Sequence, residues 1–123
     1  MGAIQGRAVA VVCVAPLLAS AALGVATAPS WTRDGDQSAS ILGQAVANAG
    51  DVNGDGYEDL VVGAPLYDNG QADEGRAYLY LGSLSGPVGP VWQYESNQAG
   101  GQCGYAVAGA GDVNGDGYAD VLI

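Results

Sequence analysis

The sequence predicts an all-β fold built from repeated sheets of four strands. Two observations support this prediction: the chain matches itself at an offset of 61 residues, and short apolar segments alternate with clusters of turn residues. A third observation is that no segment after residue 30 has the hydrophobic periodicity of a helix. The chain of 123 residues has room for one small domain of this kind.

The internal repeat covers Trp31 to Val62 and, again, Trp92 to Ile123. In this alignment 16 of 32 positions are identical without a gap, which indicates a duplication. The first copy continues with Gly63-Ala64-Pro65, whereas the second stops inside an apolar run. We therefore expect one full repeat and about half of another, in a chain that is a fragment of a longer protein.

The full repeat contains four segments with the composition of short strands. The second is continuously apolar, as in a strand buried on both faces, and in the third tyrosines alternate with alanine and leucine. The segments are residues 44–49, 59–63, 76–81 and 91–94. Four short strands in a repeat of this size predict one blade of a β-propeller. Because neighbouring blades must cover the apolar faces of a blade, we expect further blades to pack against this chain.

The first 28 residues have the features of a secretory signal peptide. Arg7 is followed by a stretch of small and apolar residues that runs to Ala28. We place cleavage near residues 26–28 and favour the bond after Ala26, because Pro29 would follow a cut after Ala28. A retained anchor is the alternative, since about 20 apolar residues span a bilayer, but a proline and many alanines weaken that span. We expect a secreted protein with no membrane span after cleavage.

The remainder of the chain is strongly acidic. It keeps all thirteen acidic residues and only two basic ones, Arg33 and Arg76. Such a surface repels phosphate backbones, so we expect no nucleic-acid partner. Cys103 is the only cysteine after the predicted signal peptide, so we expect no disulfide within the mature chain.

The pattern D-x-N-x-D-G-Y-x-D occurs twice, at Asp51–Asp59 and at Asp112–Asp120. Oxygen-bearing side chains stand at positions one, three, five and nine, and the glycine at position six permits a turn that brings the carbonyl of position seven inward. Ca²⁺ takes about six to eight oxygen ligands in a flexible shell. The predicted ligands are Asp51, Asn53, Asp55, the Tyr57 carbonyl and Asp59 in the first loop, and Asp112, Asn114, Asp116, the Tyr118 carbonyl and Asp120 in the second.

The charge of the loops predicts a structural role for this calcium, with about one ion per loop. Three carboxylates within a few ångströms repel one another without a cation, and the asparagine adds an oxygen but no further charge. Calcium would order each loop and fix the strands on either side, and so act as folding energy. The alternative is an Asx- and Gly-rich turn without an ion. Mg²⁺ is disfavoured because it keeps its waters.

The loops differ from those of EF-hand calcium sensors. In an EF-hand the twelfth position supplies a bidentate glutamate. Here the twelfth position is Val62 or Ile123, and the loop leads into an apolar strand instead of a helix. The same point counts against dockerin modules, whose loops begin similarly but run into helices.

The motifs resemble the FG-GAP repeats of integrin α-subunit propellers and their bacterial relatives. The Gly-Ala-Pro signature is present at residues 63–65. The Phe-Gly signature reads Leu42-Gly43 in the first copy and Cys103-Gly104 in the second, which puts leucine or cysteine in the apolar slot. The resemblance covers the chain from residue 31 onwards.

This resemblance implies a seven-bladed propeller in the complete protein, with calcium in the loops between the first two strands of certain blades. It implies an extracellular or cell-surface location, with calcium, further propeller blades, or another protein or glycan at the cell surface as partners. We expect a bacterial secreted protein. Its layout is a signal peptide at residues 1–28, a first blade at 29–91 with calcium loop 51–59, and a truncated second repeat at 92–123 with calcium loop 112–120.

The predicted function is a non-catalytic, calcium-binding module for binding or adhesion. The alternative is an accessory propeller region of a secreted hydrolase whose catalytic domain is absent from this chain. Catalysis is disfavoured because the chain has no histidine and no lysine. Glu58, Glu74 and Glu95 fit solvated loop acids. Trp31 and Trp92, at the same place in both repeats, fit blade packing better than a sugar-stacking platform.

Overall fold

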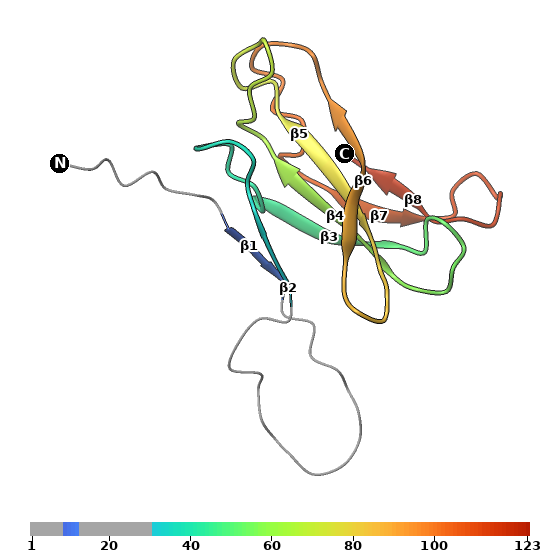
Figure 1. The fold of residues 1–123 in the computed structure, drawn as a ribbon. Helices are drawn as coiled ribbons and strands as arrows, with labels where there is room; N and C mark the ends of the chain where they lie inside the picture. Colours follow the sequence, from blue (N-terminus) through green and yellow to red (C-terminus); the bar gives the residue numbers. More distant parts are fainter. Residues whose placement is uncertain (1–8, 13–30) are drawn as a thin grey trace.

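The computed structural model describes residues 9–12 and 31–123, which form three antiparallel sheets (Figure 1). Among these residues there is no helix, and so none that is long and apolar enough to cross a membrane. The strands are β1 (Val9–Val12), β2 (Trp31–Asp34), β3 (Ala45–Gly50), β4 (Asp59–Ala64), β5 (Arg76–Leu81), β6 (Val88–Glu95), β7 (Ala108–Gly111) and β8 (Asp120–Leu122). The predicted all-β fold class is confirmed. Apart from β1, the predicted signal peptide lies outside the described residues.

Strands β3, β4, β5 and β6 form one antiparallel sheet in chain order, which is the arrangement of a propeller blade. The first three agree to within one residue at each end with the strands predicted at 44–49, 59–63 and 76–81. β6 is longer than the predicted segment, because it runs from Val88 through Pro90 to Glu95. An edge strand such as β6 tolerates a proline, since its outward N–H groups have no partner in the sheet.

Both faces of this sheet are covered. On one face Val62, Tyr78 and Tyr80 are buried against Leu42 and the partly buried Trp31, whose ring meets the ring of Tyr80 edge-on at 5.3 Å between centroids. The expected packing role of Trp31 is therefore confirmed, and leucine fills the apolar slot of the Phe-Gly signature.

The other face of the sheet is covered by the second repeat. Here Val61 and Leu79 are buried and pack against Val107 and Val121. β5 thus places its tyrosines on one face and its leucines on the other, as its alternating sequence predicts. Trp92 differs from Trp31: it is 42% exposed and stacks on Tyr94.

The two repeats touch through backbone at glycines. A Cβ on Gly63 would lie 1.8 Å from the carbonyl oxygen of Gly104, and a Cβ on Gly104 would lie 2.5 Å from that of Arg76. Gly63 belongs to the Gly-Ala-Pro signature of the first repeat and Gly104 to the Phe-Gly signature of the second. The two signatures therefore meet at one contact, which only residues without a side chain can make.

The sequence repeat is out of phase with the sheets, which the sequence analysis does not predict. Trp31 and Trp92 are equivalent in sequence, and Trp92 pairs with Leu79 on β5 whereas Trp31 pairs with Val12 on β1. Arg33 and Tyr94, also equivalent, pair with alanines on those same two strands. β1 therefore pairs with β2 in the register that β5 has with β6. Each sequence repeat begins on the last strand of one sheet and continues into the first strand of the next.

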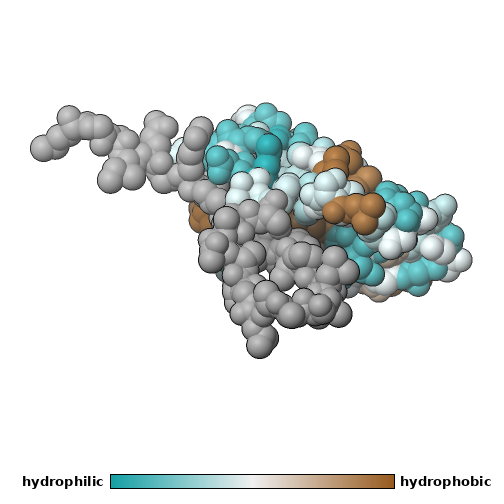
Figure 2. Space-filling view, turned by 60° about the horizontal axis from the view of Figure 1, so that its bottom comes forward, coloured by the Kyte–Doolittle hydropathy of each residue, from teal (hydrophilic) through white to brown (hydrophobic). Residues whose placement is uncertain are grey.

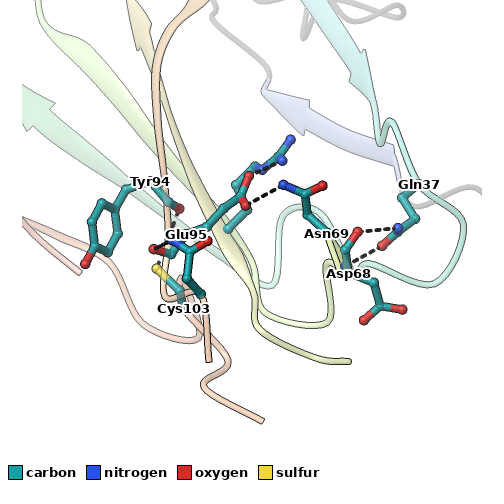
Figure 3. A network of polar contacts seen from close by, with 8 residues as sticks. Gln37, Asp68, Asn69, Tyr94, Glu95 and Cys103 are labelled. Carbon is teal, nitrogen blue, oxygen red and sulfur yellow. Dashed lines mark hydrogen bonds and ion pairs between the residues drawn. The ribbon is translucent and has the colours of Figure 1, made fainter. Parts of the chain in front are cut away.

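The loop between β4 and β5 is fixed by a polar network (Figure 3). The amide of Gln37 makes two hydrogen bonds to the backbone of Asp68, and Asn69 donates a hydrogen bond to Glu95. Glu95 also forms an ion pair with Arg76, its cross-strand partner, whose guanidinium carbon lies 3.7 Å from the ring centroid of Tyr67. These contacts hold the loop against β6 on one side and against the segment before β3 on the other.

The expectation that three glutamates are solvated is correct only for Glu58. Glu95 is mostly buried by its ion pair, and Glu74 is 0% exposed because the loop before β5 folds inward. The Glu74 carbonyl accepts hydrogen bonds from the N–H of Cys103 and the hydroxyl of Ser96. Its carboxylate oxygens have no hydrogen-bond partner among the described residues.

Gly63→Ala tests the contact between the repeats. We expect the free energy of unfolding to fall by about 3 kcal/mol, because the new methyl group meets backbone that cannot rotate away. Gly100→Ala is the control: its site has open space but a φ of +69°, so the expected loss is about 1 kcal/mol. Urea unfolding of both variants measures the difference. Equal losses would contradict the close approach.

Glu74→Gln tests the buried carboxylate. Because no hydrogen bond offsets the burial of this carboxyl group, its replacement by a neutral amide is expected to raise the free energy of unfolding by about 1 kcal/mol or more. The matched exposed substitution, Glu58→Gln, is expected to change it by less than about 0.5 kcal/mol. Chemical unfolding curves provide the comparison, and a clear loss of stability in Glu74→Gln would mean that the carboxyl group has a partner.

Candidate metal centre

The first acidic loop joins β3 to β4 and is shaped by the carboxylate of Asp51. Its Oδ1 accepts hydrogen bonds from the N–H groups of Gly54 and Asp55 at 2.7 and 3.1 Å, and its Oδ2 accepts one from Gly56 at 2.8 Å. Gly54 and Gly56 have φ values of +78° and +88°, which favour glycine. The pattern of glycines in the sequence thus allows the backbone to wrap around one carboxylate.

These hydrogen bonds also set the charge of Asp51. The N–H of Gly56 is the main cause that lowers the pKa of its carboxyl below the usual value, against an opposing effect of desolvation. The N–H groups of Gly54 and Asp55 lower this pKa further. Asp51 is therefore an anion at neutral pH, as a cation ligand must be.

Asn53 and Asp55 bond to each other across the loop. The Asn53 Oδ1 accepts the N–H of Asp55 at 3.1 Å, and its Nδ2 donates to Asp55 Oδ2 at 2.9 Å. The second oxygen of Asp55 accepts the N–H of Tyr57. Both side chains are exposed and lie on the same loop as Asp51.

Asp59 has a different environment from the other predicted ligands. It is 2% exposed at the start of β4, and its two oxygens accept the N–H groups of Val52 and Gly82, both at 2.8 Å. It therefore ties the beginning of the loop to the turn after β5. The sequence analysis did not predict this anchoring role, because the contact with Gly82 joins residues 23 positions apart.

The second acidic loop, between β7 and β8, repeats this arrangement. Asp112 accepts from Gly115, Asp116 and Gly117, and Asp120 accepts from Val113. The bonds among Asn114, Asp116 and Tyr118 also have their counterparts in the first loop. The two copies of the sequence therefore fold in the same way, and the bond of Asp59 to Gly82 is the one side-chain hydrogen bond of the first loop without a described counterpart.

The ten predicted ligands are gathered into two loops but not into closed coordination shells. Among the described residues, no three histidine, cysteine, aspartate or glutamate side chains are arranged as around a metal ion. The acceptor capacity for such an ion is nevertheless present. A carboxylate has about four lone-pair sites, and Asp51 uses three of them while Asp55 and Asp59 use two each. The N–H groups thus orient the oxygens and leave each residue a lone pair for a cation.

The two loops lie against each other at the same end of the molecule (Figure 1). The N–H of Ala119 donates to the carbonyl of Asp51 at 3.0 Å. A Cβ on Gly54 would lie 2.8 Å from the ring of Tyr118, so that ring packs directly on the first loop. The ion pairs of the described residues, Arg33–Asp36 and Arg76–Glu95, involve no carboxylate of either loop. The acidic loops therefore form one region without a protein cation of its own.

Cys103 lies half-buried with its thiol 3.7 Å from the carbonyl oxygen of Tyr94 (Figure 3). Burial, together with the charge of Glu95, raises the pKa of this thiol, which is the opposite of an activated nucleophile.

Comparison with known proteins identifies relatives of this chain. A sequence model of the family described as FG-GAP repeat matches residues 42–80. Integrin alpha-IIb of Mus musculus is 44% identical and that of Homo sapiens 43% identical, each over an alignment of 97 residues that covers 72% of this chain and 9% of the relative. Integrin alpha-PS2 of Drosophila melanogaster is 40% identical over 99 residues, 72% of this chain and 7% of that relative. The chain thus spans less than a tenth of the length of these curated relatives.

Asp59→Ala separates anchoring from metal binding. In the presence of a chelator we expect a loss of about 2–4 kcal/mol in the free energy of unfolding, because two N–H groups lose their partner. Asp55→Ala, in the exposed part of the same loop, is expected to cost less than about 1 kcal/mol under these conditions. Chemical unfolding in chelator measures both, and similar small losses would contradict the anchoring role.

Proposed function

Because the chain belongs to the FG-GAP repeat family, we propose that it is an extracellular, calcium-stabilised module for binding or adhesion. The proposed calcium binding and the proposed binding or adhesion role both start from the integrin-like repeat. One observation supports the proposed calcium binding: the same nine-residue pattern of oxygen donors folds twice with corresponding hydrogen bonds. A turn that needed no ion would not need three carboxylates in each copy.

The donor set of the loops fits Ca²⁺. All predicted ligands are hard oxygens: in the first loop Asp51, Asn53, Asp55 and Asp59 with the carbonyl of Tyr57. Asp112, Asn114, Asp116 and Asp120 with the carbonyl of Tyr118 would act in the same way in the second. A bound ion supplies positive charge against the mutual repulsion of three carboxylates, and the chain's own N–H groups hold those carboxylates in orientation.

The metal in this proposal stabilises the fold and does no chemistry. The chain has no histidine and no lysine, and its one cysteine outside the predicted signal peptide is not activated. An extracellular location is supported by the predicted signal peptide and by the family. We therefore propose a non-catalytic role.

Binding or adhesion would use a surface that borders the acidic loops. Figure 2 shows a face on which hydrophilic residues predominate and hydrophobic residues gather in small groups. A hollow of about 310 Å³ beside β6 and β8 is lined by Val52, Leu79, Trp92, Ala119, Asp120 and Val121. Its largely apolar lining suits a further blade or a protein partner better than a small charged ligand.

Calorimetric titration with Ca²⁺ tests the proposal. We expect two binding events per chain and an increase of the melting temperature that a chelator reverses, because the ion binds the folded state alone. Asp55→Ala combined with Asp116→Ala is expected to abolish both. Glu58→Ala is a matched control, since it also removes a loop carboxylate but at a position where the second loop has Ala119. No heat and no effect of chelator on a chain with the far-ultraviolet spectrum of a β protein would refute calcium binding.

A further inference from the structure

We propose that the two acidic loops bind calcium cooperatively, because the second loop forms part of the structural support of the first. This inference rests on the proposed calcium binding and adds how one site controls the other. It predicts that the first loop binds calcium more tightly when the second is occupied. By thermodynamic linkage the reverse must hold to the same degree.

The coupling starts from a backbone hydrogen bond between the two loops. Ala119 lies between two predicted ligands of the second loop, and its N–H donates to the carbonyl of Asp51, the first ligand of the other loop. Ordering the second loop around an ion fixes this N–H in space. The backbone of Asp51 is then held before its own ion arrives.

Close packing reinforces this bond. A Cβ on Gly50 would lie 2.6 Å from the Cβ of Ala119, and one on Gly54 would lie 2.8 Å from the ring of Tyr118. The first loop therefore has no space to move toward the second. A segment that is already confined loses less conformational entropy when it closes around an ion, so the second ion binds more tightly.

The contact is directional, and this provides an internal control. Tyr118 reaches across to the first loop, but Tyr57, at the same position of its own loop, lies beside Gly82 in its own sheet, where a Cβ on that glycine would come 3.1 Å from the Tyr57 Cβ. Both tyrosines are partly exposed. Removing one ring therefore breaks a contact between loops, and removing the other does not.

Electrostatics acts against the coupling, and salt reduces this opposing effect. An ion in one loop reduces the negative charge that attracts an ion to the other. Asp55, Asp112 and Asp116 are exposed to solvent and Asp51 is partly exposed, and salt at physiological strength screens exposed charges beyond about 8 Å. The direct backbone and ring contacts are not screened in this way. If these contacts set the sign of the coupling, as we propose, the cooperativity increases with ionic strength.

Calcium titration of the ¹⁵N-labelled full chain, followed by NMR, resolves the two sites. The N–H groups of Gly56 and Gly117 each donate to the first aspartate of their own loop and report it separately. In Asp116→Ala we expect the Gly117 response to disappear and the Gly56 midpoint to rise about fivefold or more. Asp116→Asn, a milder change, should raise the Gly56 midpoint in the same direction. Spectra of the β4 and β5 amides establish that each variant is folded.

The ring variants complete the test. Tyr118→Ala keeps the predicted carbonyl ligand and should weaken the effect of the second loop on the Gly56 midpoint, whereas Tyr57→Ala should leave the Gly117 midpoint within about twofold. If Asp116→Ala removes the Gly117 response but leaves the Gly56 midpoint unchanged, the cooperativity is refuted and calcium binding stands. If neither glycine responds in the unmodified chain, calcium binding itself is refuted and the cooperativity with it.

Discussion

The structure depends on covering both faces of the β3–β6 sheet. One face is closed by the segment that contains Trp31 and Leu42, and the other is closed by the second repeat through Val107 and Val121. The glycine contact between Gly63 and Gly104 sets how closely that second repeat approaches. With this close approach β7 lies beside β3, so the loops that follow the two strands also come into contact. The position of the acidic loops is therefore a consequence of how the sheets pack.

Within the loops the same oxygens serve the fold and the proposed metal. Asp51 and Asp112 are turned inward by N–H groups of glycines, and Asp59 closes the loop onto the turn after β5. Such bonds fix the directions of the carboxylates but do not neutralise their charge. A cation bound by the remaining lone pairs would remove this repulsion. The second repeat is largely exposed and buries few apolar residues. A bound cation would therefore add stability in the part of the chain where packing supplies little.

Local patterns were sufficient to predict most of the fold. The apolar run of β4 and the alternating sequence of β5 predicted where these strands begin and end and which side chains share a face. Both predictions agree with the structure, because each pattern arises within a few neighbouring residues. The glycines of the acidic loops predicted their tight turns for the same reason. The pairing of β1 with β2 was not predictable, since it joins distant segments and follows from no local pattern.

The errors in the sequence analysis concern burial that arises from distant contacts. Glu74 and Glu95 have the sequence context of surface loops, but the inward fold of the loop before β5 buries the first and Arg76 pairs with the second. The anchoring of Asp59 by Gly82 depends on a turn that follows another strand. Trp92 repeats Trp31 in sequence and yet lies exposed, because a side chain is buried by what packs on it and not by its own type.

The phase difference between sequence repeat and sheet has a consequence for how such chains grow. The second copy of the 61-residue unit begins at Trp92 on β6, the closing strand of one sheet, and continues into β7 and β8 of the next. Every added copy therefore arrives already joined to its predecessor by a shared sheet. A cut at the start of the second copy would therefore divide β6 and break the β3–β6 sheet.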